Sequence, residues 1–194
     1  IGVVDISKFT CTETHFEKVI VIAPTIFGDQ RGFFMETYNR KEFHELGIDV
    51  DFVQDNHSRS KKGTLRGLHF QKQHAQSKLV RVVNGAVFDV VVDIRPDSST
   101  FGEWFGCVLS EENKKLLFVP EGFAHGFLVL TESADFLYKC SEFYHPEFEA
   151  GIIWNDEDIA IDWPLKEYGV DELILSEKDR KLPKLKELTL RGEL

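Results

Sequence analysis

The sequence predicts an all-β protein, a sandwich or barrel, on three observations. Short runs of β-branched and aromatic residues recur from residue 52 onward, compact turn signals separate them, and helical periodicity is rare. The chain has 194 residues, of which 42% are hydrophobic and 17 are Phe, enough for one substantial core. Because no linker, repeat or low-complexity tract interrupts it, we expect a single domain over residues 1–194.

The first fifty residues contain two expected strands and one expected helix. The run KVIVIAP ends in a proline and leads through the turn-forming cluster FGDQRG into FFMETY, which predicts two strands around a tight loop. Asn39 is placed to cap a short helix, RKEFHEL, which Gly47 would end. It is the one helix expected in the first half of the chain.

The remaining strands follow in quick succession. They are DFVQDNHS, TLRGLHF, KLVRVV, AVFDVVVDI, TFGEWFGCVL, LLFVP, AHGFLVL and DFLYKCSEFY. The turn signals KKG, PEG and TESA separate several of them, and Asn84-Gly85 is the strongest hairpin signal in the chain. Near the C-terminus, WPLKEYG and LSEKDRKLP predict loops and helical turns that cover one rim of the barrel.

Charge and hydropathy exclude several classes of function. The net charge of −10 and the pI near 5.2 argue against a general affinity for nucleic acid or an anionic membrane. The chain begins without a signal-peptide pattern and has no window of 18 apolar residues, so we expect a cytoplasmic protein without a membrane span. Cys11, Cys107 and Cys140 have no CxxC spacing, which fits thiols in a reducing compartment.

One segment, residues 56–88, is basic in an otherwise acidic chain. It holds seven Lys or Arg residues and three of the seven histidines, with no Asp or Glu. Lysines near turns and on edge strands often only prevent strand pairing, which would explain Lys61 and Lys62. Arg66 fits that interpretation less well, because strand alternation places it on one face with Leu68. Cations in the mouth of a barrel would bind an anion such as a phosphate.

Histidines in this segment raise the questions of catalysis and metal binding. Arg66 and His69 project to opposite faces of a strand unless a bulge at Gly67 re-aims it, and a lone His69 fits a buried structural role as well as a catalytic one. Barrel metal sites usually start from a His-x-His pair, but here Gln71 takes the second position. His125 alone is too few ligands, so we expect no metal site.

Eight blocks of sequence, taken together, resemble one family. FGDQRGFFMETYN, FVQDNHS, LRGLHFQ, AQSKLVRVVNGAVFDVVVDIR, STFGEWFG, PEGFAHGF, IIWND and LSEKD are similar, in this order, to the dTDP-4-dehydrorhamnose 3,5-epimerases. Residues 1–17 and 184–194 lie outside the recognised core. The resemblance implies a cupin-type jelly roll and a dTDP-sugar substrate whose C4 ketone acidifies the hydrogens at C3 and C5. Neither a metal nor a redox cofactor is then required.

The resemblance also implies roles for particular residues. His69 of the RGLH block corresponds to the base, and Asp179 of LSEKD is its partner, although Asp179 could equally cap a turn through its spacing from Ser176. Tyr138 is the acid on the opposite face of the sugar, and Lys78 stabilises the enolate. Substrate binding carries over to Arg31, Glu36, Gln54, Asp55, Asn56, Arg66, His125, Glu149 and Lys178.

Three interpretations of function stay open at this point. The first is a cofactor-free enzyme that inverts both C3 and C5. The second is a single-centre epimerase or a 3,4-ketoisomerase on a related nucleotide keto-sugar. The third is a non-catalytic sugar-nucleotide-binding barrel or a metal-dependent cupin. The family resemblance further implies a homodimer with an exchanged strand, for which FEKVIVIAP is the candidate, so that Arg31 would serve the partner's site.

Overall fold

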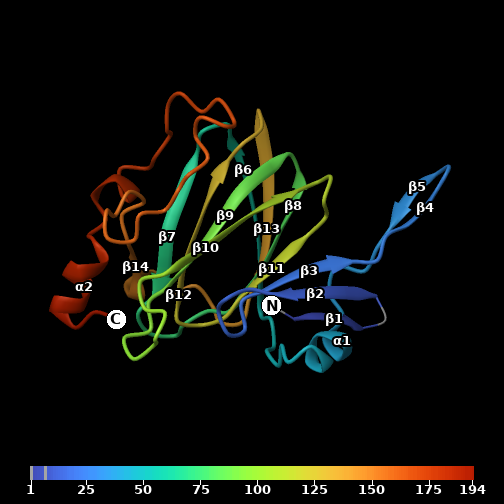
Figure 1. Cartoon of the computed structure of the whole chain (residues 1–194), viewed down its shortest axis with the longest axis horizontal. Helices are drawn as coiled ribbons and strands as arrows, with labels where there is room; N and C mark the ends of the chain where they lie inside the picture. The colour runs from blue at the N-terminus through green and yellow to red at the C-terminus, as the bar shows by residue number, and fades with distance from the viewer. Residues whose placement is uncertain (1, 7) are drawn as a thin grey trace.

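The computed structural model describes residues 2–6 and 8–194, and it confirms the all-β prediction (Figure 1). Within these residues, seven strands form a larger sheet in the order β1-β2-β3-β11-β8-β13-β6. Five strands form a smaller sheet in the order β10-β9-β12-β7-β14. The sheets face each other as a jelly roll, and a separate two-stranded hairpin, β4-β5, projects from one end (Figure 1).

The element bounds follow the predicted runs closely from residue 54 onward. The larger sheet consists of β1 (Val3–Ile6), β2 (Phe9–Glu13), β3 (Ile20–Pro24), β11 (Leu116–Val119), β8 (Lys78–Asn84), β13 (Ser133–Cys140) and β6 (Gln54–Lys61). The smaller sheet consists of β10 (Trp104–Ser110), β9 (Ala86–Asp93), β12 (Phe123–Val129), β7 (Leu65–Gln71) and β14 (Glu149–Gly151). The hairpin is β4 (Phe27–Asp29) and β5 (Gly32–Phe34), and the helices are α1 (Arg40–Glu45) and α2 (Leu185–Arg191).

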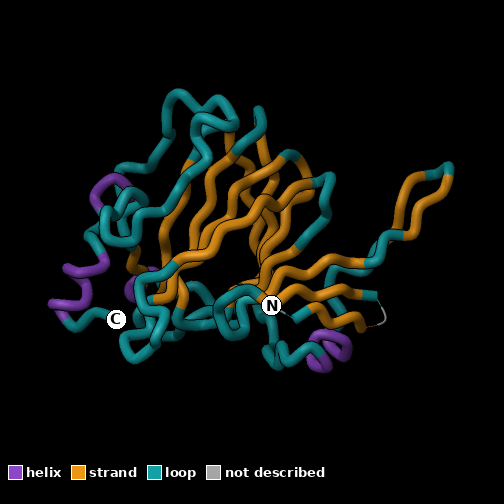
Figure 2. Tube along the Cα trace, in the orientation of Figure 1, coloured by secondary structure: helices purple, strands orange, loops and turns teal. Residues whose placement is uncertain are grey.

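Strand alternation divides the core into three apolar layers. Side chains such as Val80, Val91 and Phe136 fill the space between the two sheets. The outer face of the smaller sheet is covered by the C-terminal segment, which is mostly loop (Figure 2) and ends in α2. Phe43 of α1 packs on part of the larger sheet's outer face. Among the residues that the structure describes, no helix lies on the remainder of that face, over β13 and β6.

Two predicted strand pairings are wrong. Asn84-Gly85 does not close a hairpin, because β8 pairs with β11 and β13 in one sheet while β9 pairs with β10 and β12 in the other. The turn, with Gly85 at φ 72°, therefore passes the chain from sheet to sheet. The KVIVIAP run does not pair with FFMETY either. It forms β3 between β2 and β11, and the FGDQRG turn closes the short β4-β5 hairpin instead.

The predicted helix agrees with the structure, and so do the predicted loops and helical turns near the C-terminus, but these cover the outer face of the smaller sheet and not a rim of the barrel. The Asn39 side chain accepts hydrogen bonds from the backbone N–H groups of Lys41 and Glu42, and Gly47 follows α1 with φ 80°. The described C-terminal segment consists of loops, the 3₁₀ turns Pro146–Phe148 and Asp179–Lys181, and α2. None of the helices in the described ranges is long and apolar enough to cross a membrane.

Candidate active site

A cavity of about 280 Å³ opens between the two sheets at β6, β7 and β13. Two sets of side chains face each other across it. His69 of β7 lies on the smaller-sheet side, and Lys78 and Tyr138 of the larger sheet lie on the other. The lining is completed by Gln54, Asn56, Phe70, Gln71, Gln76, Tyr144 and Glu149. Six of the predicted site residues therefore meet in one place.

A bulge in β7 brings His69 to this interior face. On β12 the paired residues His125 and Phe127 are two apart, whereas their partners His69 and Arg66 on β7 are three apart. The extra residue lies at Gly67 or Leu68, so Arg66 and His69 share a face despite their odd spacing. Gly67 has φ 113°, and a Cβ there would lie 2.7 Å from the Cα of Gly126, so only glycine fits.

Asp179 holds the ring of His69. Its Oδ1 lies 2.6 Å from Nε2 of His69, and the two residues are 110 apart in sequence. The carboxylate is buried, and its own backbone N–H donates to the hydroxyl of Ser176, as the capping spacing predicted. Burial raises the pKa of Asp179, but the hydrogen bond and charge of His69 outweigh that effect and the net pKa is lowered. An ionised Asp179 thus leaves Nδ1 of His69 as the basic nitrogen.

Across the cavity, Tyr138 and Lys78 supply a proton donor and a cation. Burial raises the pKa of the Tyr138 hydroxyl, so it carries its proton at neutral pH. The ammonium group of Lys78 lies 6.0 Å from the centroid of the Tyr138 ring. Burial lowers the pKa of Lys78, and Cys140, Asp89 and Glu149 oppose this lowering. Both groups belong to the larger sheet, opposite His69.

Glu149 links two other side chains at the rim of the cavity, Tyr144 and Lys178. Its carboxylate accepts a hydrogen bond from the Tyr144 hydroxyl at 2.7 Å and forms an ion pair with Lys178 at 2.5 Å. Burial raises the pKa of Glu149, whereas Lys178 and Tyr144 lower it, and the net direction is downward. The same hydrogen bond raises the pKa of Tyr144 to about 12. Glu149 therefore holds an exposed aromatic side chain and a lysine beside His69.

Two further predicted residues lie around this cavity. The guanidinium of Arg66 donates two hydrogen bonds to the hydroxyl of Ser60 and forms no ion pair with any residue in the described part of the chain. It is therefore available to an anion. His125 is buried behind the cavity, where its Nε2 lies 2.9 Å from Asp89 Oδ1.

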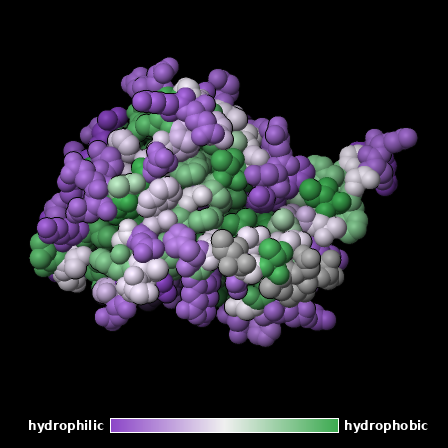
Figure 3. All heavy atoms as spheres, in the orientation of Figure 1, coloured by the Kyte–Doolittle hydropathy of each residue, from purple (hydrophilic) through white to green (hydrophobic). Residues whose placement is uncertain are grey.

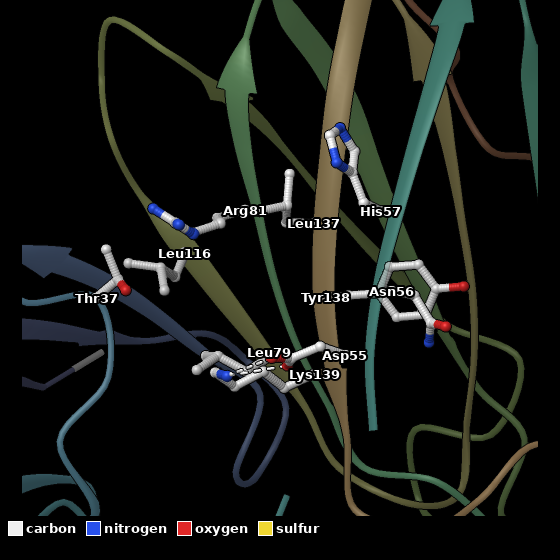
Figure 4. Close-up of a pocket in the computed structure, with 10 residues that line it drawn as sticks. All are labelled: Thr37, Asp55, Asn56, His57, Leu79, Arg81, Leu116, Leu137, Tyr138 and Lys139. Carbon is white, nitrogen blue, oxygen red and sulfur yellow. Dashed lines mark hydrogen bonds and ion pairs between the residues drawn. The ribbon is translucent and has the colours of Figure 1, made fainter. Parts of the chain in front are cut away.

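Three predicted binding residues lie away from the cavity of their own chain. Arg31 is exposed on the β4-β5 turn and pairs with Asp29, and Glu36 pairs with Lys8. Asp55 projects from the outer face of β6 and pairs with Lys139 (Figure 4). In that view Tyr138 and Asn56 point to the opposite side of the same two strands.

Sequence reasoning missed several residues of the site. Tyr144 and Gln71 line it, and Gln71 also ties together two loops by donating to the His74 carbonyl and accepting from the His145 N–H. Asp89 was visible only as a single acid in the apolar run AVFDVVV. Among the described residues, no group of three or more His, Cys, Asp or Glu side chains is placed to hold a metal ion.

Comparison with known proteins identifies the family. The family profile described as dTDP-4-dehydrorhamnose 3,5-epimerase matches residues 13–187. The chain belongs to the dTDP-4-dehydrorhamnose 3,5-epimerase family. A relative of that name from Escherichia coli is 58% identical over 177 residues, which cover 90% of this chain and 94% of the relative.

Solved structures of this epimerase family share the fold. A Legionella pneumophila enzyme crystallised with dTDP-4-keto-L-rhamnose superposes with a TM-score of 0.88 at 51% identity, covering 92% of this chain and 93% of that one. A 3'-monoepimerase from Streptomyces bikiniensis in complex with dTDP-quinovose superposes with a TM-score of 0.86 at 32% identity, covering 93% and 90%. The predicted family and its cupin-like jelly roll are confirmed.

Proposed function

We propose that this protein is a cofactor-independent epimerase that inverts C3 and C5 of dTDP-4-keto-6-deoxyglucose to give dTDP-4-keto-L-rhamnose. The observation that carries the proposal is the placement of a His-Asp pair and a protonated tyrosine on opposite walls of one cavity. Inversion requires a base on one face of the sugar ring and a proton donor on the other. Family membership and the ligand of the Legionella relative support the choice of substrate.

The reaction follows from the acidity of hydrogens beside a ketone. Nδ1 of His69 removes the proton from C3 or C5, and the electron pair moves onto the C4 oxygen as an enolate. The Lys78 ammonium stabilises that oxygen as its charge develops. Tyr138 then gives a proton to the opposite face of the same carbon. A positioned base of this kind contributes about 10²- to 10⁴-fold in rate.

Binding of the nucleotide is assigned to the groups around the cavity. Arg66 would contact the pyrophosphate, since its guanidinium offers two parallel N–H donors to phosphate oxygens. Gln54 and Asn56 would hold the nucleoside by hydrogen bonds, beside Tyr144. Because the cavity of about 280 Å³ is small for a nucleotide sugar, the sugar would occupy it and the nucleotide would extend across the rim.

We also propose that each chain folds as a single domain and that two chains form a homodimer. We place this dimer in the cytoplasm. Hydrophobic side chains gather on the projecting hairpin and polar ones at its tip (Figure 3), and Phe27, Phe33 and Phe34 are all exposed. A second copy would cover them. The hairpin, and not β3, is the candidate for exchange, because β3 is already paired along both edges. Arg31 and Glu36 would then reach the partner's cavity.

The test is deuterium uptake from D₂O into dTDP-4-keto-6-deoxyglucose, followed by NMR at C3 and C5 with a chelator present. We expect label at both carbons and inverted product. Label at one carbon would show a single-centre epimerase, as in the Streptomyces bikiniensis relative. Tight binding without any label would refute catalysis and leave a binding protein.

A further inference from the structure

The loop between β13 and β14 carries two large rings to the rim of the cavity. Phe143 is 58% exposed, and Tyr144 is 50% exposed although it lines the cavity. Exposed loop residues are ordinarily among the most mobile parts of a protein. Rings in such a loop keep one position only where specific contacts hold the backbone that carries them.

Gln71 of β7 supplies such contacts from the smaller sheet. Its side-chain Nε2 donates to the carbonyl oxygen of His74 at 2.6 Å and to that of Phe143 at 3.3 Å. Its Oε1 accepts from the backbone N–H of His145 at 2.7 Å. Burial of an amide group is costly unless its hydrogen bonds are made. Gln71 is buried, and its whole amide group is bonded to the backbones of two loops.

The larger sheet holds the same loop from the other side of the cavity. The backbone N–H of Tyr144 donates to Oε1 of Gln54 at 3.0 Å, and the Tyr144 hydroxyl donates to Glu149 at 2.7 Å. The ring of His145 stacks on that of His74, with the centroids 4.3 Å apart. Tyr144 is thus held at its backbone and at its hydroxyl while half of it stays exposed.

Resting on the proposed function, we infer that Gln71 is a positioning residue for substrate binding. It holds Tyr144 at the rim in the position that meets the nucleotide. A loop that is already ordered binds more tightly than a mobile one, because its conformational entropy is lost before the ligand arrives. Proton transfer by His69 and Tyr138 does not use the Gln71 amide. Loss of this amide therefore weakens binding and leaves the chemical step in place.

The decisive variant is Gln71→Met, which keeps the length of the side chain and removes its donors and its acceptor. We expect the Kd of dTDP, measured by calorimetry, and the KM of the keto-sugar to rise about 10-fold. The kcat should change by less than about 2-fold. In a Tyr144→Ala background the same change has little further effect on the Kd of dTDP, because Gln71 acts through Tyr144. An equal factor in both backgrounds, or a fall in kcat without a change in KM, overturns the inference.

Gln73→Met is the matched control. It makes the same chemical change in the loop between β7 and β8, where Gln73 is exposed. We expect the Kd of dTDP in this variant to equal that of the unaltered protein. A loss of affinity as large as that of Gln71→Met would show that any glutamine of this region produces the effect, and the inference would fail.

A measurement without ligand separates this inference from the proposed function. In the unaltered protein, NMR should show the His145 amide exchanging with solvent at least about 10-fold more slowly than in an unstructured peptide. This protection should disappear in Gln71→Met. An unprotected His145 amide in the unaltered protein, or protection that survives in the variant, overturns the inference. If the unaltered protein exchanges no deuterium into the keto-sugar, the proposed function fails, and amide exchange with dTDP binding still decides whether Gln71 positions Tyr144.

Discussion

At the scale of single residues, the base and the acid of the cavity come from distant parts of the chain. His69 is held by Asp179, which is 110 residues away, and Tyr138 faces the cavity from the other sheet. The base and the acid belong to different sheets, so neither is positioned by its sequence neighbours. The two can therefore be removed separately.

Substitution of the base and of the acid should have different effects on the same assay. We expect His69→Asn to lose at least about 10²-fold of deuterium uptake at both carbons, because no other group takes the proton. Tyr138→Phe should still exchange deuterium but lose inversion, since the proton returns to the face it left. NMR of the substrate in D₂O measures both quantities.

The control for this pair is Tyr168→Phe, in the C-terminal segment packed on the outer face of the smaller sheet. It should exchange and invert as the unaltered protein does. Equal losses of exchange in His69→Asn and Tyr138→Phe would contradict the assignment of one group to each face.

The sequence indicated residue types for this site more readily than residue partners. The basic segment 56–88 followed from composition, and the roles of His69 and Tyr138 came from family resemblance. Strand alternation placed Arg66 and His69 on opposite faces unless a bulge at Gly67 intervened, and only the structure shows the bulge.

Tyr144 escaped because it lies in the loop between β13 and β14, where no strand alternation indicates its direction. Asp89 escaped because its hydrogen-bond partner, His125, lies on the neighbouring strand β12, and local sequence does not show which strands are neighbours.

At the scale of elements, the shape of β7 determines the aim of His69. Its bulge requires Gly67 to adopt φ 113° within 2.7 Å of the β12 backbone. Gly47 offers a comparison, because it also has a positive φ of 80° but has no atom within 4 Å of an added Cβ. A substitution at Gly47 therefore measures the cost of backbone strain alone, whereas one at Gly67 adds the cost of steric contact.

Alanine substitutions at these glycines should differ in both stability and activity. We expect Gly47→Ala to lower the free energy of unfolding by about 1 kcal/mol, the cost of a left-handed conformation. Gly67→Ala should cost about 2 kcal/mol or more and also reduce kcat, because the clash moves β7 and His69 with it. Urea unfolding and steady-state kinetics measure the two effects. Equal losses would show that contact with β12 is unimportant.

At the end of β9 the side chains of Arg95, Ser98 and Thr100 donate hydrogen bonds to the Asp93 carboxylate, a cluster called here the Asp93 clasp. This clasp should make part of the free energy of unfolding depend on pH. Burial raises the pKa of Asp93, but hydrogen bonds from Arg95, Ser98 and Thr100 outweigh it and bring the pKa to about 2. Because this lies below the ordinary value of 3.8, Asp93 stabilises the fold fully above that value, and the contribution disappears as the pH falls through about 2.

Asp93→Asn should therefore lower the free energy of unfolding by about 2 kcal/mol at pH 7. The difference from the unaltered protein should shrink steadily below pH 4. Urea unfolding at pH 7 and near pH 2.5 provides the comparison. A difference that stays constant over this range would show that the clasp acts through shape and not through charge.

Individual strands were predictable at this scale, but several of their neighbours were not. Short runs of β-branched and aromatic residues located β7, β9 and β12, which are largely buried on both faces. The predicted hairpin at Asn84-Gly85 was wrong because these two residues favour a tight turn whether or not the flanking strands pair. Here the turn connects β8 of one sheet to β9 of the other. Pairing depends on which distant strand offers a free edge, which local sequence does not encode.

At the scale of the whole molecule, two uncovered features lie on one chain. The β4-β5 hairpin exposes three phenylalanines, and the outer face of β8 and β13 holds a cavity of about 240 Å³. In that cavity Arg81 lies among Leu79, Leu116 and Leu137 (Figure 4). Arg81 forms no ion pair with the residues that the structure describes, and burial lowers its pKa. Both features fit contact with a second copy.

Loss of the hairpin aromatics should therefore weaken the proposed dimer. We expect the double substitution Phe33→Ser and Phe34→Ser to shift the protein toward monomer in sedimentation velocity, and to lower activity because Arg31 no longer reaches the partner's cavity. The control is Leu190→Ser, which alters a 79% exposed leucine on α2 at the far side of the molecule. An unchanged association state in the hairpin variant would argue against exchange of the hairpin.

Because His69 and Asp179 are 110 residues apart, the order in which the ribosome releases the chain determines when the active site can form. The last strand of either sheet ends at Gly151, well before the carboxylate that completes the base. Because a single domain generally folds as a unit, release of residues 176–194 both completes the base and adds Leu185 and Leu188, which are buried against the smaller sheet. A nascent chain thus gains its chemistry together with the last part of its core, and a protease that removes the segment after residue 175 would remove Asp179 and these two leucines at once.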